Sequence, residues 1–171
     1  MQTGGLDRDG CFARFQLADL RASFIMSDAA MPITSVTELL ADVQSRPTWD
    51  GASISPADAD YPLVFLDWHE GHGFVFQCYE DEGSWSDFLV TSRQFSTPSV
   101  EVELGGQALE RWPRELFVSA EHATHALNHF LDRGKQESAL EWVRIDRFPR
   151  ETLWDGREQR LAWERANPRK R

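Results

Sequence analysis

Three of the five histidines lie close together in the sequence, at positions 122, 125 and 129. Spacings of three and four residues place them on one face of a helix. Imidazoles on one face can ligate zinc, but a structural zinc site needs four ligands and a closed shell. The opposite face of the same helix carries Ala120, Ala123, Leu127, Phe130 and Leu131. We therefore predict that His122, His125 and His129 form a solvated face, with partner contact and metal binding as the alternatives.

The other two histidines, His69 and His72, flank the turn in the stretch WHEGHG. An H-x-x-H pair can bind a metal, but two imidazoles and one acid at a hairpin tip are typical of polar turn chemistry. The sequence contains no GxSxG, P-loop or GxGxxG motif, and Cys78 in an apolar stretch indicates an inert core thiol. We predict no enzyme, no cofactor and no catalytic, cofactor-binding or metal-binding residue.

Capping signals predict two main helices. Thr34 or Ser35 can cap a helix that Pro47 ends, and Ser119 can cap a second helix over residues 120–133 that Gly134 ends. A shorter helix is expected within residues 12–26, where apolar residues recur at helical spacing. The two helices would hold their apolar stripes against a common core.

Between these helices the period changes to that of strands. Residues 61–69 and 73–80 are rich in β-branched and aromatic side chains and predict a β-hairpin. Further strands are expected within residues 84–93, 99–104 and 139–148, and residues 105–115 are expected to form a loop. The prediction is an α+β fold, in which a mostly antiparallel sheet of four to six strands carries the two helices, with helical extensions at both termini.

The predicted organisation is one compact domain with two appendages. Residues 33–148 form the α+β domain, residues 1–32 an N-terminal extension, and residues 149–171 a helical or basic C-terminal tail. No apolar stretch is long enough to span a bilayer, and two cysteines are too few for a disulfide framework. A reduced cytoplasmic environment and a monomer are expected.

Charge is concentrated in the middle of the chain. The formal net charge is −10, and residues 36–110 contain fourteen acidic and two basic residues. This balance argues against direct binding to nucleic acid or to anionic membranes, because both need a basic surface. The negative block either keeps the protein dispersed or meets a basic protein partner, whose approach it would accelerate.

The C-terminal half resembles a known family. Residues 116–142 form a strand end, a capped helix, a glycine just past the helix and a terminal E-W. This order is similar to the Imm1 family of immunity proteins, whose members tend to finish with such a helix, a glycine–proline turn and a strand with tryptophan. Phe130, Gly134 and Trp142 match the pattern, whereas GKQES lacks the proline. The resemblance covers about residues 33–146, and the matching residues are those of a scaffold.

The resemblance implies an immunity protein that neutralises a toxin of a polymorphic or interbacterial system, with nucleic-acid deaminases and nucleases prominent among such toxins. These toxins act on polyanions and tend to present basic clefts, which an acidic and aromatic surface could cover in a 1:1 complex. Two stretches offer that mixture. The predicted partner-binding residues are Asp67, Trp68, Glu70, Glu80, Asp81, Glu82, Trp85 and Asp87. The alternatives are core packing for both tryptophans, a small metal enzyme using His69 and His72 or the helix histidines, and an adaptor unrelated to toxins.

Overall fold

The fold is built on a seven-stranded antiparallel sheet with the strand order β2-β1-β3-β4-β5-β6-β9. The computed structural model describes residues 20–27, 30–95, 100–104 and 108–148. The predicted α+β class is confirmed, although the sheet has more strands than the four to six expected. The strands are β1 (Leu20–Phe24), β2 (Met31–Pro32), β3 (Ala52–Pro56), β4 (Leu63–His69), β5 (Gly73–Tyr79), β6 (Asp87–Leu89) and β9 (Trp142–Arg144).

The two predicted helices are present, and both caps form as expected. In α1 (Val36–Ser45), the side chain of Ser35 accepts a hydrogen bond from the Glu38 backbone N–H at 3.1 Å. In α2 (Ala120–Arg133), Ser119 caps the first turn, and Gly134 ends the helix with a φ of 65°. The left-handed conformation at Gly134 explains the glycine there.

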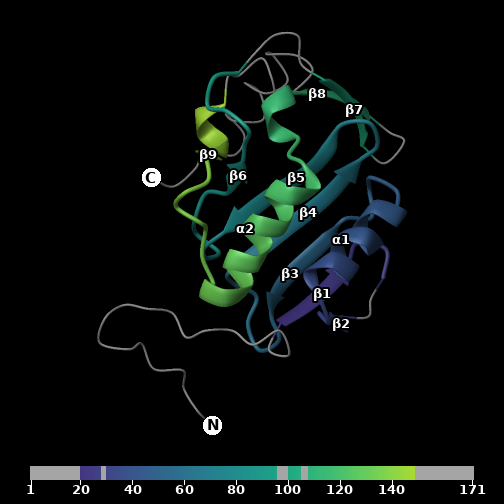
Figure 1. Cartoon of the computed structure of the whole chain (residues 1–171), viewed down its shortest axis with the longest axis vertical. Helices are drawn as coiled ribbons and strands as arrows, with labels where there is room; N and C mark the ends of the chain where they lie inside the picture. The colour runs from purple at the N-terminus through teal and green to yellow at the C-terminus, as the bar shows by residue number, and fades with distance from the viewer. Residues whose placement is uncertain (1–19, 28–29, 96–99, 105–107, 149–171) are drawn as a thin grey trace.

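Both helices cover the same face of the sheet (Figure 1). Alternate residues of the strands point to this face, where they pack with α1 and α2 in the larger of two core clusters. The fully buried Phe74, Phe76 and Phe130 belong to this cluster. The apolar residues that form stripes along the helices and alternate along the strands therefore pack together in one core.

A small second sheet packs against part of the other face. It consists of β7 (Val100–Leu104) and β8 (Ala108–Trp112), which pair in antiparallel register. Val75 and Phe88 alternate with residues of the first core and instead join Val100 and Val102 in a second cluster. The prediction of a loop over residues 105–115 is wrong for β8, because the pairing with β7 outweighs its local turn composition.

Residues near the N-terminus contribute to the sheet. Leu20–Phe24 forms β1, so the helix expected within residues 12–26 is wrong for this part. Leu20 and Phe24 fit a helical period, but Ala22 is also buried and gives the period of two. The sheet thus includes residues on both sides of the expected boundary at position 33, and β3 had not been predicted. Residues 1–19 and the expected tail, 149–171, lie outside the described residues.

The helices of the described chain are short. The longer of the two main helices, α2, has 14 residues. Among the described residues, none forms a helix with the length and apolar character that crossing a membrane requires.

Candidate functional site

Two acidic loops meet at one end of the sheet. The loop between β3 and β4 carries Asp58 and Asp60, and the loop between β5 and β6 carries Glu80, Asp81 and Glu82. The β4–β5 register pairs Leu63 with Tyr79, so both loops leave the sheet at the same end. All five carboxylate side chains belong to exposed residues. We call these five residues the acidic end.

The loop after β5 is held in a defined shape by its own hydrogen bonds. The hydroxyl of Ser84 accepts the backbone N–H groups of Glu80 and Asp81 and donates to the carbonyl of Asp81 at 2.9 Å. The Asp81 carboxylate accepts the N–H of Gly83 at 2.8 Å. The side chains of Glu80 and Glu82 make no hydrogen bond or ion pair with the residues that the structure describes. The loop therefore presents these two charges to solvent at low conformational cost.

A polar groove of about 870 Å³ lies beside the acidic end, on the sheet face that the helices leave open. Its lining is Arg21, Ser23, Ala30, Ser53, Ser55, Ala59, Asp60, Tyr61, Leu63 and Glu82. The serines come from β1 and β3, where they alternate with core residues. Ser23 and Ser53 share a hydrogen bond at 2.8 Å, and the Arg21 guanidinium lies 3.3 Å from the Asp60 carboxylate. The groove combines hydroxyl groups, one guanidinium and a carboxylate rim.

The predicted partner-binding residues do not form one surface. Glu80, Asp81 and Glu82 lie at the acidic end, whereas Asp67, Trp68 and Glu70 lie toward the β4–β5 turn. Six residue steps of the hairpin separate the two ends, which is roughly 20 Å at about 3.4 Å per residue. The two groups could contact one partner only through an interface that runs along the hairpin.

The predicted partner-binding residues near the β4–β5 turn also differ in how far they are buried. Trp68 packs on the main core beside Phe74, with ring centroids 4.8 Å apart, so the core-packing alternative holds for its ring. Asp67 is half-buried, its carboxyl lies against Gly51 just before β3, and burial raises the pKa of this carboxyl to about 6. Among these three, only Glu70 is exposed.

Trp85 lies two residues before β6 and Asp87 begins that strand, and both contact other parts of the chain. The Arg144 guanidinium carbon is 5.8 Å from the centroid of the Trp85 ring. The Asp87 carboxylate accepts a hydrogen bond from the Gln136 side-chain amide at 2.9 Å. Both residues are half-buried, so they offer a partner less area than the loop before them does.

His69 is buried, which corrects the expectation of polar turn chemistry at this position. Only 3% of the residue is exposed, and its ring packs against Phe117 and Trp112 at centroid distances of 5.3 and 5.8 Å. Burial, with a smaller contribution from His72, lowers the pKa of His69 to about 4. The imidazole is therefore neutral at pH 7. His72 is exposed, and its ring centroid lies 5.3 Å from that of Phe117.

The helix histidines point away from the core, as predicted. His122 and His125 are exposed, and His129 is half-buried. The loop after α2 adds Glu137, whose carboxylate lies 2.7 Å from His129 Nδ1 and 3.9 Å from His125 Nε2. The helix alone did not reveal this acid, because it lies on a different element. A hollow of about 610 Å³ borders His125, His129 and Glu137.

Neither histidine group, as the structure describes it, is arranged as a metal site. Within the described ranges, no group of three or more histidine, cysteine, aspartate or glutamate side chains has the geometry to hold a metal ion. Cys78 is buried in β5, and burial raises the pKa of its thiol to about 12. Its surroundings are those of an unreactive core thiol.

The groove was not predicted from the sequence. Arg21, Ser23, Ser53 and Ser55 come together through the pairing of β1 with β3, and neither strand had been predicted. The sequence feature that could have indicated these two strands is the alternation of small polar and apolar residues over 20–24 and 52–56.

No protein-family model matches this chain, and a comparison with curated proteins also found no match.

Proposed function

We propose that this protein is an immunity protein that binds a cognate toxin domain, a nucleic-acid deaminase or nuclease, and neutralises it by covering a basic cleft. The observation that carries the proposal is the acidic end, where five exposed carboxylates from two loops flank a polar groove. The resemblance of residues 33–146 to the Imm1 family supports the same reading. The protein needs no catalytic group for this activity.

Electrostatics favour a basic protein as the partner. Carboxylates gathered at one end raise the rate of encounter with a positively charged cleft and orient it before contact. The side chains of Asp58, Glu80 and Glu82 have no partner among the described residues, so their charges remain available. Arg21 within the groove is already engaged with Asp60 and Ser55.

The groove adds hydrogen-bonding capacity to this charge. Hydroxyl groups can donate and accept, so the serine floor can pair with backbone N–H and C=O groups of an inserted loop. The rim carboxylates of Asp60 and Glu82 can accept from arginine or lysine side chains of that loop. A loop that occupies this groove would be withdrawn from its nucleic-acid substrate.

The test is co-expression with the C-terminal domain encoded by the gene immediately upstream. Rescue of growth and 1:1 co-purification are the expected results. The variant Asp58→Lys/Glu80→Lys/Glu82→Lys should then lower the association rate at least about tenfold at low salt and flatten its salt dependence.

A matched control carries the same change of charge at other exposed acids. Glu70→Lys/Glu121→Lys/Glu141→Lys should leave the association rate within about threefold of the unmodified protein. Equal losses in both variants would show that net charge alone is responsible. A larger loss in the control would move the surface away from the acidic end, and absence of any binding would reject the proposed function.

A further inference from the structure

Exposed apolar side chains are concentrated at one edge of the sheet. Among the described residues, four large apolar side chains are exposed, and all belong to the β1–β2 hairpin or to the loop after α1. They are Ile25 at 65%, Met26 at 72%, Met31 at 40% and Trp49 at 46% exposure. We call these four residues the apolar edge.

Hydrogen bonds bring the two segments of the apolar edge together. The backbone N–H of Met26 donates to the Asp50 carboxylate at 2.8 Å, and that of Ile25 donates to the carbonyl of Gly51. Trp49 precedes Asp50 directly, so it lies near the end of β1. In Figure 1 the β1–β2 hairpin and the end of α1 lie together at the border of the sheet.

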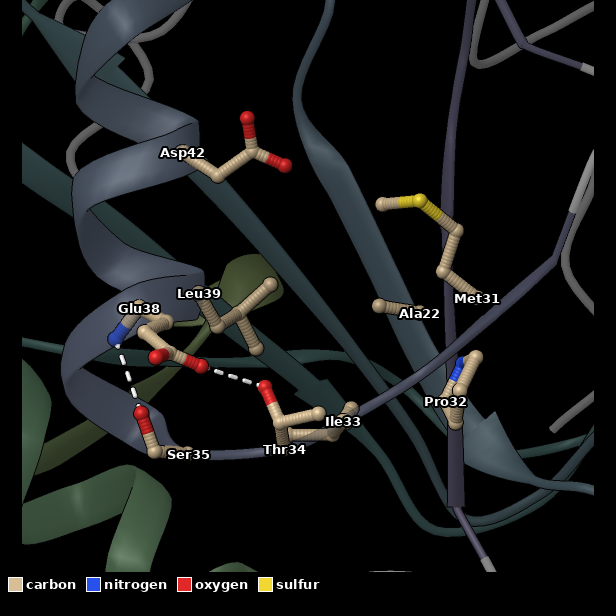
Figure 2. Close-up of a pocket in the computed structure, with 9 residues that line it drawn as sticks. All are labelled: Ala22, Met31, Pro32, Ile33, Thr34, Ser35, Glu38, Leu39 and Asp42. Atoms are coloured by element: carbon tan, nitrogen blue, oxygen red, sulfur yellow. Dashed lines mark hydrogen bonds between the residues drawn. The ribbon is translucent and has the colours of Figure 1, made fainter.

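A cavity of about 210 Å³ opens beside this edge, between α1 and the β1–β2 hairpin. Figure 2 shows Asp42 of α1 and Met31 of β2 directed toward it from opposite sides, with Ala22 and Leu39 between them. At the lower end, the Thr34 hydroxyl donates to the Glu38 carboxylate at 2.5 Å. One wall is therefore acidic and the other is apolar.

We propose that the apolar edge is a docking surface for a basic protein partner, and that the adjoining cavity receives an arginine side chain of that partner. An arginine has an apolar stem and a planar charged end. The stem would lie against Met31, Leu39 and Ala22, and the guanidinium would donate to Asp42 and Glu38. Tryptophan and methionine are enriched in the cores of protein interfaces.

Charge complementarity selects this occupant over a second copy of the chain. A second copy would bring the same two carboxylates, Glu38 and Asp42, to the same edge. The nearby cation, Arg46, pairs with Asp50 at 2.6 Å and with Asp42 at 3.5 Å, and it stacks 3.6 Å from the centroid of the Phe24 ring. This single guanidinium is therefore shared between two carboxylates and does not reach Glu38 in the described structure. A partner with its own free arginine satisfies the carboxylates without repulsion.

The inference deepens the proposed function, on which the identity of the partner rests. Charges at the acidic end would govern the association rate, whereas buried anchors govern the dissociation rate. Trp49→Ala and Met26→Ala should each raise the dissociation rate of the upstream-encoded toxin domain at least about fivefold, with the association rate little changed. Binding that both variants leave unchanged would overturn the docking surface while the proposed function stood.

The cavity is tested on the full chain without the toxin. The sequence has three methionines, so methyl-labelled methionine gives three resolved reporters: Met1, Met26 and Met31. N-acetyl-arginine amide should shift the Met31 signal saturably. N-acetyl-citrulline amide, which has a similar shape without the charge, should not. A silent Met31 signal, or equal shifts with both compounds, would overturn the assignment.

Variants make this experiment specific to the two carboxylates. Glu38→Gln/Asp42→Asn should abolish the arginine-induced shift, whereas Glu121→Gln/Glu141→Gln should retain it with the same loss of charge. Signals of Met26 and Met31 that change with protein concentration alone would indicate a second copy at this edge and would also overturn the proposal. Absence of toxin binding would reject the proposed function, while the titration with N-acetyl-arginine amide would still decide whether the cavity binds an arginine side chain.

Discussion

The two ends of the β4–β5 hairpin carry similar residues in opposite environments. At the acidic end, Glu80 and Glu82 are exposed. At the other end, which we call the turn end, Asp67 is half-buried and His69 is 3% exposed. The difference comes from the elements that cover each end. The η2 segment (Arg114–Leu116) leads to Phe117, which packs on His69, and to Val118, which pairs with Phe74. No described element covers Glu80 and Glu82.

Ionisable residues at the two ends of one hairpin can therefore act in different processes. Asp67 and His69 at the turn end are desolvated, and their ionisation is coupled to folding. Ionisable groups at the acidic end contribute little to folding and remain free for a partner.

The largest effect is expected from Gly73→Ala at the turn end. Gly73 has a φ of +137°, and an added Cβ would lie 2.6 Å from the Val118 carbonyl oxygen. Phe74 and Val118 exchange backbone hydrogen bonds at this point, so the strand cannot move away without breaking them. Strain and overpacking together should lower the free energy of unfolding by about 3 kcal/mol, measured by urea denaturation.

Gly71→Ala is the matched control in the same turn. Gly71 also has a positive φ, of 76°, but nothing lies within 4 Å of its added Cβ. Only the left-handed backbone penalty applies, about 1 kcal/mol. Equal losses for the two variants would contradict the close approach of Val118 to β5.

The second prediction concerns the pH dependence of stability at the turn end. The pKa of His69 is lowered to about 4 by burial, from about 6.5 in an unfolded chain. Between these values the unfolded state binds a proton that the folded state does not, so stability rises with pH. His69 should thus cost roughly 2–3 kcal/mol as pH falls from 7 to 4. His69→Gln should remove this loss, whereas His122→Gln on the exposed face of α2 should not.

Asp67 should act in the opposite direction over nearly the same range. Burial raises its pKa to about 6, so between pH 4 and 6 the folded state holds a proton that the unfolded state releases. Stability from Asp67 therefore falls as pH rises, by roughly 1–3 kcal/mol. The unmodified protein should show a flatter pH profile than either His69→Gln or Asp67→Asn, whose slopes should have opposite signs. Parallel slopes in the two variants would contradict the burial of one of these groups.

Elements that neighbouring residues determine could be predicted from the sequence. Helix bounds followed from Ser35, Ser119 and Gly134, because capping is a local effect that neighbouring residues decide. The β4–β5 hairpin followed from its alternation and glycine turn. Long-range pairing set the rest, since β8 forms against β7 and β1 lies between β2 and the distant β3.

The candidate site was harder to predict for the same reason. Glu80, Asp81 and Glu82 were identified from composition, but Asp58 and Asp60 join them only through the β3–β4 register. His69 was expected at a polar tip because Trp112 and Phe117, which bury it, are 43 and 48 residues away in the chain. Burial of a short polar stretch depends on which distant element covers it.

The smallest effect is expected at the acidic end. Asp58→Lys/Glu80→Lys/Glu82→Lys replaces three exposed charges that make no described hydrogen bond or ion pair. Relief of repulsion among the acids should leave stability unchanged or raise it by at most about 0.5 kcal/mol at low salt, with no effect at 1 M salt. The same variant is expected to lose fast binding to the toxin domain. If it instead unfolded more easily, the acids would serve the fold, and their exposure would no longer argue for a partner.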